Sequence, residues 1–343
     1  MPRIHIPTLL GADARRIPLA DGTVQCVVTS PPYWNQRKYG GEQEDVWGGS
    51  PVCVHQWGVE RTIRQSPQRD HAKGGGFAQT RGTEAARSGM AFEASLGSLC
   101  VICGAWKGAF GFEPNVGLYV SHTVEILREI RRVLTPDGVA FWNVGDKYVN
   151  KSLVLVPDRV AIAAKEDGWF VRSEIIWLKP DAMPRSVKDR PTDAHERILM
   201  LTKSARYYWD PEALREPAKT KDCGPDGKRN GRNIWEMEVS RFGGAHFATF
   251  PEELPRRCIL AASRPGDIVA DVFAGTGTTG KVAMEHDRRC ILLDRNYSGE
   301  GGYEILARGR FKNVLLEHGS QHEANLLARD ISFSDLEADA SRD

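Results

Sequence analysis

The sequence predicts an α/β fold, in which a doubly wound, mostly parallel sheet is flanked by helices and interrupted by loop insertions. Two observations support this prediction. Runs of β-forming residues alternate with stretches of helical periodicity through much of the 343 residues, a pattern typical of parallel strands joined by helices. A glycine-rich loop also lies directly between a predicted strand and a predicted helix, as in nucleotide-binding sheets.

Three α/β units follow one another along the chain. In the first, residues 119–138 form a helix that ends in a Pro-Asp-Gly turn and leads into the strand VAFWNVG. One face of this helix is apolar, with Val120, Val124, Leu127, Ile130 and Leu134. In the second, residues 155–180 form a helix ending near Gly168 and a strand ending near Leu178. In the third, residues 258–296 give a helix, a strand, the glycine-rich loop, a helix and a strand.

Length and composition predict a globular protein with one large domain or two smaller ones, because 41% hydrophobic residues can supply a sizeable core. No signal-like leader and no apolar run of about 20 residues is found, so we expect a soluble, cytoplasmic protein without membrane association. The seven cysteines are then expected to be reduced. A net charge of +1 does not by itself indicate a nucleic-acid partner.

Three stretches break the α/β rhythm. Residues 56–99 are polar and glycine-rich, and we expect them to form a mobile insertion. Residues 181–245 are loop-like and basic, which fits either a ligand contact or plain solvated surface. The acidic tail, residues 319–343, is expected to fray. The basic residues of the second stretch include Lys219, Lys221, Lys228, Arg229 and Arg232.

The stretch VQCVVTSPPYWNQRKYG, residues 24–40, ends a predicted strand in an unusual way. Pro31 and Pro32 fix φ, lack N–H groups and favour extended backbone in the residue before each of them. The carbonyls here are therefore rigid, and they lie beside the hydroxyl of Ser30 and the ring of Tyr33. This combination predicts a holder for a flat, polar group.

The glycine-rich loop predicts a nucleoside site. Gly275, Gly277 and Gly280 follow a strand and begin a helix, whose N-terminus offers unpaired N–H groups and positive potential. Asp294 ends the next strand, where a carboxylate can accept both hydroxyls of a ribose. The pattern alone fits a nicotinamide cofactor as well as S-adenosylmethionine. However, the loop comes so late in the chain that most of the sheet must be built from earlier strands, which implies a permuted order.

These motifs together resemble the β-class amino-methyltransferases of DNA, in which the catalytic motif precedes the cofactor motif. The resemblance covers residues 8–317, with TSPPY (29–33) similar to the catalytic motif and DVFAGTGTTG (271–280) similar to the cofactor loop. It implies a circularly permuted methyltransferase domain formed by residues 1–55 and 100–318, with target-recognition loops in 181–245. The cofactor residues that it implies are Asp13, Phe247, Thr249, Asp271, Phe273, Gly275, Gly277, Thr278, Gly280 and Asp294. The DNA-contacting residues that we expect are Arg185, Lys188, Lys228, Arg229 and Arg232.

The resemblance implies methyl transfer from S-adenosylmethionine to the N4 amine of a cytosine flipped out of double-stranded DNA. Ser30 and the Pro31 carbonyl would accept the amine N–H groups, Pro32 would keep them rigid, and Tyr33 would stack on the base. N6-methylation of adenine is the alternative, and a nicotinamide-dependent oxidoreductase or a catalytically silent nucleic-acid-binding module is more remote. A cognate restriction endonuclease is a candidate partner.

Four further residues suggest a metal site. Cys53 and His55 precede the predicted insertion, and Cys100 and Cys103 follow it. Cys-x2-Cys is a common zinc half-site, although Cys-x-His is less usual. We therefore expect either one structural zinc that clips the base of the insertion, or thiols that never bind a metal.

Overall fold

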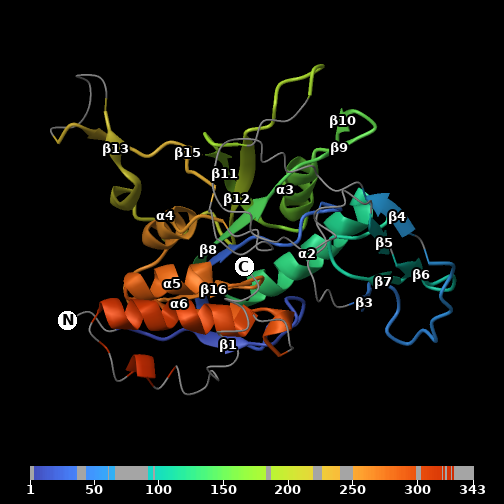
Figure 1. Ribbon diagram of the computed structural model, residues 1–343, viewed down its shortest axis with the longest axis horizontal. Helices are drawn as coiled ribbons and strands as arrows, with labels where there is room; N and C mark the ends of the chain where they lie inside the picture. The colour runs from blue at the N-terminus through green and yellow to red at the C-terminus, as the bar shows by residue number, and fades with distance from the viewer. Residues whose placement is uncertain are drawn as a thin grey trace, which may run out of the picture.

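The computed structural model describes residues 4–36, 44–60, 62–65, 92–95, 97–182, 187–218, 226–239, 250–298, 303–318, 320, 323–325 and 327. Its centre is an eight-stranded sheet with helices on both faces (Figure 1). In spatial order the strands are β1 (Thr8–Leu10), β17 (Arg289–Leu293), β16 (Ile268–Asp271), β2 (Val24–Thr29), β8 (Leu134–Val144), β12 (His195–Thr202), β11 (Phe170–Leu178) and β15 (Ile234–Glu236).

The predicted mostly parallel, doubly wound sheet is confirmed. β12 runs antiparallel to β8 and to β11, and the other five strand pairs are parallel. Strands from the beginning and the end of the sequence are neighbours in the sheet, as the pairing of β2 with β16 shows. The sheet is therefore built in the permuted order that the late glycine-rich loop predicted, and the carboxyl ends of β2 and β16 meet at one edge.

Helices cover both faces, so each inner strand buries its side chains in two directions. The helices are α2 (Val116–Val133), α3 (Val156–Glu166), α4 (Glu253–Ala262), α5 (Thr278–Glu285) and α6 (Tyr303–Glu317). Along β2, Cys26 and Val28 pack in the core with α4, α5 and α6, whereas Val27 packs in the core with α2 and α3. This two-sided burial explains why residues 24–28 are a nearly continuous β-forming run instead of an alternating one.

The three predicted α/β units are present. The first helix, α2, begins at Val116, where the side chain of Asn115 accepts a hydrogen bond from the backbone N–H of Leu118 at 3.0 Å. In the second unit, α3 and β11 end close to the predicted positions, at Glu166 and Leu178. In the third, α4, β16, α5 and β17 follow in the predicted order.

The prediction that residues 181–245 are loops was wrong for β12, an inner strand of the sheet. Ile198 to Leu201 are apolar and almost fully buried, and they fill the place between β8 and β11. The polar residues before and after this short run hid it in the overall composition of the stretch. The rest of the described stretch includes a short helix η1 (Glu212–Leu214) and a small hairpin of β13 (Glu216–Pro217) and β14 (Lys228–Arg229).

A small lobe lies at one side of the sheet, at the right of Figure 1. It contains the three-stranded sheet β3 (Asp45–Trp47), β7 (Trp106–Gly108) and β6 (Ser98–Leu99), and the hairpin β4 (Thr62–Gln65) and β5 (Phe92–Ser95). The described ends of the predicted mobile insertion are thus paired strands, and its middle, residues 66–91, lies outside the described residues.

Two remaining features complete the fold. A short hairpin joins β9 (Tyr148–Val149) and β10 (Ser152–Leu153), and a 3₁₀ turn η2 (Arg295–Ser298) follows β17.

In the tail that we expected to fray, Ala324 and Leu327 are buried in the core beside α6, because an otherwise polar segment carries these apolar side chains. In the part of the chain that the structure describes, no helix has the length and apolar character needed to cross a membrane.

Candidate active site

A cavity of about 450 Å³ opens where the carboxyl ends of β2, β8 and β16 meet. Part of its lining comes from the glycine-rich loop and the segments around it, including Asp13, Trp47, Phe110, Phe273, Gly275, Thr276, Asp294, Arg295, Asn296 and Tyr303. Another part comes from the Ser30–Tyr33 motif and the residues that surround it, including Ser30, Pro31, Pro32, Tyr33, Gln36, Asn143, Trp177, Lys179, Glu196 and Val239. The structure therefore brings the two predicted motifs to one continuous space.

Gly275 and Asp294 form a turn at the cavity wall. The backbone N–H of Gly275 donates to one oxygen of Asp294 at 2.9 Å, and the N–H of Asn296 donates to the other at 2.9 Å. Burial raises the pKa of Asp294, against the effect of these two hydrogen bonds. Gly275 has a φ of 48°, and a Cβ at this position would meet open space. The backbone is thus open to a ligand here.

The other two glycines of the motif make close packing contacts. A Cβ on Gly277 would lie 3.0 Å from Ala307 and 3.1 Å from Phe311, and one on Gly280 would lie 2.7 Å from Leu292. These contacts are with α6 and β17, and neither glycine lines the cavity. Gly277 and Gly280 allow the helix after the loop to pack closely, which fits the third glycine of such motifs.

Two other residues predicted at the cofactor lie behind the loop. Both oxygens of Asp271 are engaged, with Thr29 Oγ1 at 2.7 Å and Thr279 Oγ1 at 2.7 Å. Burial raises the pKa of Asp271 to about 6. Thr278 accepts a hydrogen bond from Arg310 at 2.9 Å, away from the cavity. Asp271 therefore ties β2 to the loop and α5, and its contribution to the nucleoside site is through the position of the backbone.

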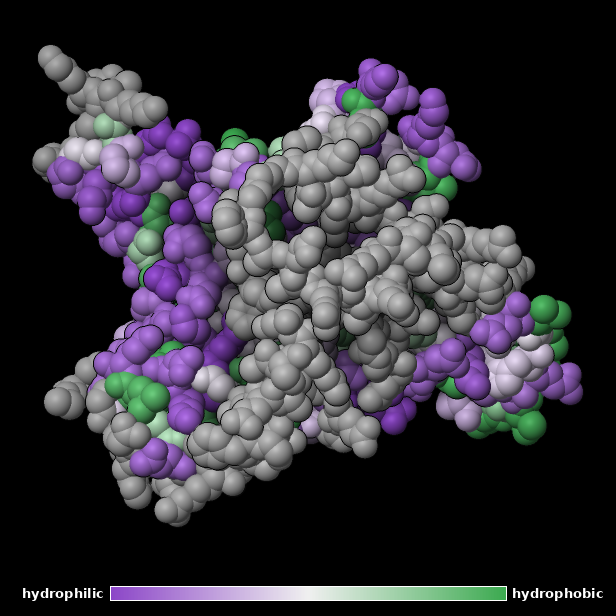
Figure 2. Space-filling model, in the orientation of Figure 1, coloured by the Kyte–Doolittle hydropathy of each residue, from purple (hydrophilic) through white to green (hydrophobic). Residues whose placement is uncertain are grey.

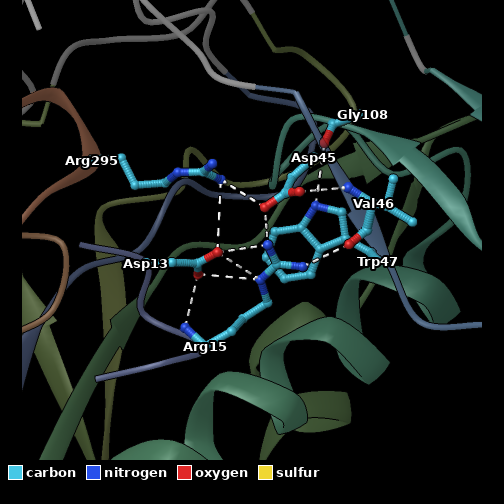
Figure 3. Close-up of polar contacts among 7 residues, drawn as sticks. All are labelled: Asp13, Arg15, Asp45, Val46, Trp47, Gly108 and Arg295. Atoms are coloured by element: carbon cyan, nitrogen blue, oxygen red, sulfur yellow. Dashed lines mark hydrogen bonds and ion pairs between the residues drawn. The ribbon is translucent and has the colours of Figure 1, made fainter. Parts of the chain in front are cut away.

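Asp13, predicted among the cofactor residues, belongs to a charged network at the cavity wall (Figure 3). Arg15 donates to both Asp13 oxygens, the shortest bond being 2.6 Å, and also forms an ion pair with Asp45 of β3. Arg295 lies 3.2 Å from Asp45 and 3.9 Å from Asp13. Although burial opposes ionisation, the hydrogen bonds from Arg15 hold the pKa of Asp13 below its usual value. Asp13 is therefore an anion with a fixed orientation.

The cavity wall also holds a chain of polar side chains around Tyr33. The hydroxyl of Ser30 lies 3.2 Å from the hydroxyl of Tyr33, which donates to Glu196 at 2.6 Å. Asn143 Nδ2 donates to the Tyr33 hydroxyl at 2.7 Å and to Glu196 at 3.1 Å. The ammonium of Lys179 forms an ion pair with the other oxygen of Glu196. These contacts fix the position of the aromatic ring beside the proposed base pocket.

The two prolines place this pocket at the end of β2. Pro31 and Pro32 both line the cavity, and the Pro32 carbonyl accepts a hydrogen bond from Tyr119 of α2 at 3.1 Å. Trp34 does not line the cavity; it packs in the core and donates to the carbonyl of Glu113 at 2.9 Å. Cys26 is fully buried in the core, and burial raises the pKa of its thiol.

The structure describes some of the remaining predicted site residues but not all of them. Three of them lie outside the described residues: Phe247 and Thr249, expected at the cofactor, and Arg185, expected to contact DNA. Lys188 and Lys228 are exposed. Arg229 and Arg232 both pair with Glu216, at 3.1 and 2.5 Å, on the β13–β14 hairpin. Their positive charge is therefore partly balanced locally.

The comparisons with known proteins agree with this geometry. The profile of a DNA methylase family matches residues 24–298. The Type II methyltransferase M.Cfr9I of Citrobacter freundii is 35% identical over 84% of this chain and 83% of its own length, and M.XycI of Xanthomonas campestris pv. cyanopsidis is 34% identical with the same coverage.

The chain belongs to this DNA methylase family. It is therefore a DNA methyltransferase that uses S-adenosylmethionine. The fold agrees with that of the cytosine-N4-specific PvuII DNA methyltransferase, with a TM-score of 0.54, 16% identity, and coverage of 92% of this chain and 95% of that one. It also agrees with a putative DNA modification methylase from Thermus thermophilus in complex with S-adenosyl-L-methionine, with a TM-score of 0.50, 21% identity, and coverage of 90% and 94%.

Sequence reasoning missed several residues that line the cavity of this methylase. Asn143 and Glu196 are the clearest, because they bind Tyr33 and come from β8 and β12. Each is a polar residue in or next to an apolar run, ending VAFWN and beginning ERILML. That signal is visible in the sequence, since a polar side chain inside a buried strand needs a partner. Trp47 of β3 and Phe110, two residues after β7, were missed because they lie on short segments without a periodic pattern.

Proposed function

We propose that this methylase transfers a methyl group from S-adenosylmethionine to the N4 amine of a cytosine swung out of duplex DNA. One observation carries the proposal. The glycine-rich loop with Asp294, and the Ser30–Tyr33 motif, line the same cavity of about 450 Å³. A nucleoside held by the loop and a flat base held by the motif would therefore lie in one space, with the methyl group between them.

The residues around the glycine-rich loop fit an adenosine with a charged methionine tail. Asp294 offers carboxylate oxygens next to the open backbone at Gly275, where a ribose would lie. The rings of Phe110 and Phe273, whose centroids are 5.8 Å apart, supply apolar walls for an adenine. Asp13 is held ionised at the rim and can accept from an amine.

The residues of the Ser30–Tyr33 motif fit an exocyclic amine. Its lone pair is delocalised into the ring, so acceptors that hold both N–H groups favour the pyramidal, nucleophilic form. The Ser30 hydroxyl and the Pro31 carbonyl serve as these acceptors, and the two prolines keep them in place before the reaction. The lone pair forms the bond to the methyl carbon as the carbon–sulfur bond breaks, S-adenosylhomocysteine leaves, and the amine releases one proton to solvent.

Cytosine N4 is preferred to adenine N6 because Ser30 is a neutral acceptor in the catalytic motif. The indole of Trp34 does not narrow the pocket, since it packs in the core. The test is to methylate duplex DNA, digest it to nucleosides and separate these by mass spectrometry. N4-methylcytosine is expected. N6-methyladenine alone would overturn the assignment of the base but leave the methyl transfer in place.

A cognate restriction endonuclease is the partner that fits relatives named as Type II methyltransferases. Methylation at one short sequence would then protect host DNA from cleavage at that sequence. Methylome sequencing of a host that expresses the protein should find one modified motif. Modification spread over unrelated sequences would contradict a role in such a pair.

A further inference from the structure

The small lobe brings together four side chains that the proposed methyl transfer does not use. Cys53, His55, Cys100 and Cys103 each offer one ligand atom, and these atoms all lie within 4.8 Å of one another. The sulfurs of Cys53 and Cys100 are 4.0 Å apart, and the sulfur of Cys103 is 3.4 Å from His55 Nδ1. Tetrahedral zinc with Zn–S bonds of about 2.3 Å requires sulfurs about 3.8 Å apart.

The backbone around the cluster has the close turns that a metal site needs. The N–H of Gly104 donates to the carbonyl of Cys100 at 2.9 Å, and the N–H of Cys100 donates to Ala105 at 2.7 Å. This turn directs both cysteines of Cys-x2-Cys toward the same point. Gly49 passes so near that a Cβ there would lie 2.9 Å from the sulfur of Cys103.

The side chains adjacent to the ligands in the sequence point toward solvent. Val52 and Val54 flank Cys53 and are 88% and 87% exposed, and Val101 and Ile102 between the other two cysteines are also exposed. Figure 2 shows hydrophobic surface at this edge of the molecule, where Figure 1 places the lobe. Apolar side chains thus face outward while polarisable ligand groups face inward, with Cys100 3% exposed. Hydrophobic burial does not explain that orientation.

A disulfide explains it less well than a metal. A disulfide requires sulfurs about 2.05 Å apart, and the Cys53–Cys100 separation is 4.0 Å. A Cys53–Cys100 disulfide would also leave the short distance of 3.4 Å between the Cys103 sulfur and His55 Nδ1 unexplained. Three thiolates and one imidazole in a closed shell are the ligand set of a structural zinc site.

The cluster is connected to the part of the cavity around the glycine-rich loop through the lobe sheet. Cys100 directly follows β6, β6 pairs with β7, and β7 pairs with β3. β3 carries Asp45, which pairs with Arg15 and Arg295 beside Asp13 (Figure 3), and Trp47, which lines the cavity. Trp47 also stacks on Phe110 with centroids 5.2 Å apart. The wall at the proposed cofactor site is therefore formed in part by the lobe.

We propose that Cys53, His55, Cys100 and Cys103 bind one Zn²⁺, and that this ion holds β3, β6 and β7 in the register that forms the cofactor wall. The ion connects the segment after β3 to the segment between β6 and β7, so it closes this small sheet at one end. The role of the zinc is structural, because all four positions are taken by protein ligands and none is left for a substrate. The link to cofactor binding rests on the proposed function.

The first experiment measures metal content by mass spectrometry of the purified full chain. We expect about one zinc per chain, its loss in Cys100→Ser and Cys103→Ser, and its retention in the matched controls Val101→Ser and Ile102→Ser, which change exposed residues of the same turn. If the cysteine variants fail to fold, His55→Cys should retain zinc and His55→Gln should lose it. Cobalt substitution should give the sulfur-to-cobalt charge-transfer band of thiolate ligation. Wild-type protein without bound zinc, or cobalt without that band, overturns the site.

The second experiment measures binding of S-adenosylmethionine by calorimetry before and after zinc is removed with a chelator. The dissociation constant should rise about tenfold or more on removal, and return when Zn²⁺, but not Mg²⁺, is added back. An unchanged constant would refute the link between the ion and the cofactor wall. Neither readout depends on methyl transfer, so zinc-free protein that methylates DNA contradicts only this inference, and zinc-bound protein that fails to methylate contradicts only the proposed function.

Discussion

The hydroxyl of Tyr33 donates to Glu196 Oε2 at 2.6 Å, although the two residues are 163 positions apart in the chain. Glu196 also accepts from Asn143 and pairs with Lys179, so the tyrosine hydroxyl is one member of a fixed polar network. The network sets the angle of the Tyr33 ring in the cavity. It explains how a residue after a proline-rich turn can present a rigid stacking surface.

Tyr33→Ala should abolish most methyl transfer and leave cofactor affinity unchanged. The ring provides the stacking that offsets extrusion of the base, which is about 1–3 kcal/mol or roughly 5–150-fold. Tyr33→Phe keeps the ring, so its methyl-transfer activity should fall much less. Steady-state kinetics and calorimetry with S-adenosylmethionine separate the two effects. Near-normal turnover of Tyr33→Ala would remove the ring from the mechanism.

Ser30→Ala should likewise reduce turnover while S-adenosylmethionine still binds, because it removes an acceptor for the target amine. The loss of one such hydrogen bond in the transition state is typically about 100-fold or more in turnover. Ser30→Thr, which keeps the hydroxyl, is the matched control. Equal turnover of Ser30→Ala and wild type would show that the hydroxyl does not hold the amine.

Gly275→Ala should mainly affect cofactor binding, and Gly277→Ala should mainly affect stability. Both residues have positive φ, so both alanine variants carry similar backbone strain of about 1–2 kcal/mol. The new methyl group at Gly275 faces open space at the cavity and should weaken cofactor binding, whereas that at Gly277 meets Ala307 and Phe311 and should mainly lower the melting temperature. The reverse pattern would mean that the cofactor lies elsewhere.

Stability should fall as the pH rises through the range in which Asp271 ionises. Burial raises the pKa of Asp271 from its ordinary 3.8 to about 6. The folded state therefore binds the proton more tightly than the unfolded state, and this contribution is complete below about pH 4 and lost as the pH rises past about 6, by roughly 3 kcal/mol. Asp271→Asn cannot ionise. Urea unfolding from pH 4.5 to about 7 should show the wild type losing stability relative to this variant, and parallel curves would contradict the assignment.

The basic residues of the 181–245 stretch should differ in their contribution to DNA binding. Lys188→Gln and Lys228→Gln should each reduce the slope of log affinity against log salt by about 1, because both residues are exposed. Arg232→Gln should change the slope less, since Glu216 already pairs with Arg232 at 2.5 Å. Glu216→Gln is the matched control, and should strengthen binding. Equal slopes in all variants would make this surface irrelevant to DNA.

The fold could be predicted because its main signals are local. The apolar face of α2, the strand that precedes Gly275 and the position of Asp294 can each be identified within a short window of sequence, although Pro-Asp-Gly, predicted as a turn, belongs to β8. β12 could not be found in this way. Its pairing with β8 and β11 is non-local, and the polar residues around it obscure the four-residue apolar core of the strand.

The sequence predicted the site residues that belong to its two motifs. It did not predict the contacts that depend on helices and strands distant in the chain. Ser30, Tyr33, Gly275 and Asp294 do line the predicted cavity. The roles of Gly277 and Gly280 depend on α6, which packs against them from the far end of the chain. The position of Asp45 beside Arg15 and Arg295 depends on the pairing of β3 with β7, a contact between short segments with no periodic pattern.

The hydrogen bond between Thr29 and Asp271 joins residues 242 positions apart, at the point where β2 and β16 end. On a ribosome that adds about 5–20 residues per second, roughly 12–48 s pass between synthesis of the first partner and of the second. During that interval the Ser30–Tyr33 motif has no strand β16 beside it and no glycine-rich loop. A nascent or prematurely terminated chain that lacks residue 271 therefore cannot modify DNA, so competence for methyl transfer arises only when the last part of the sheet is made.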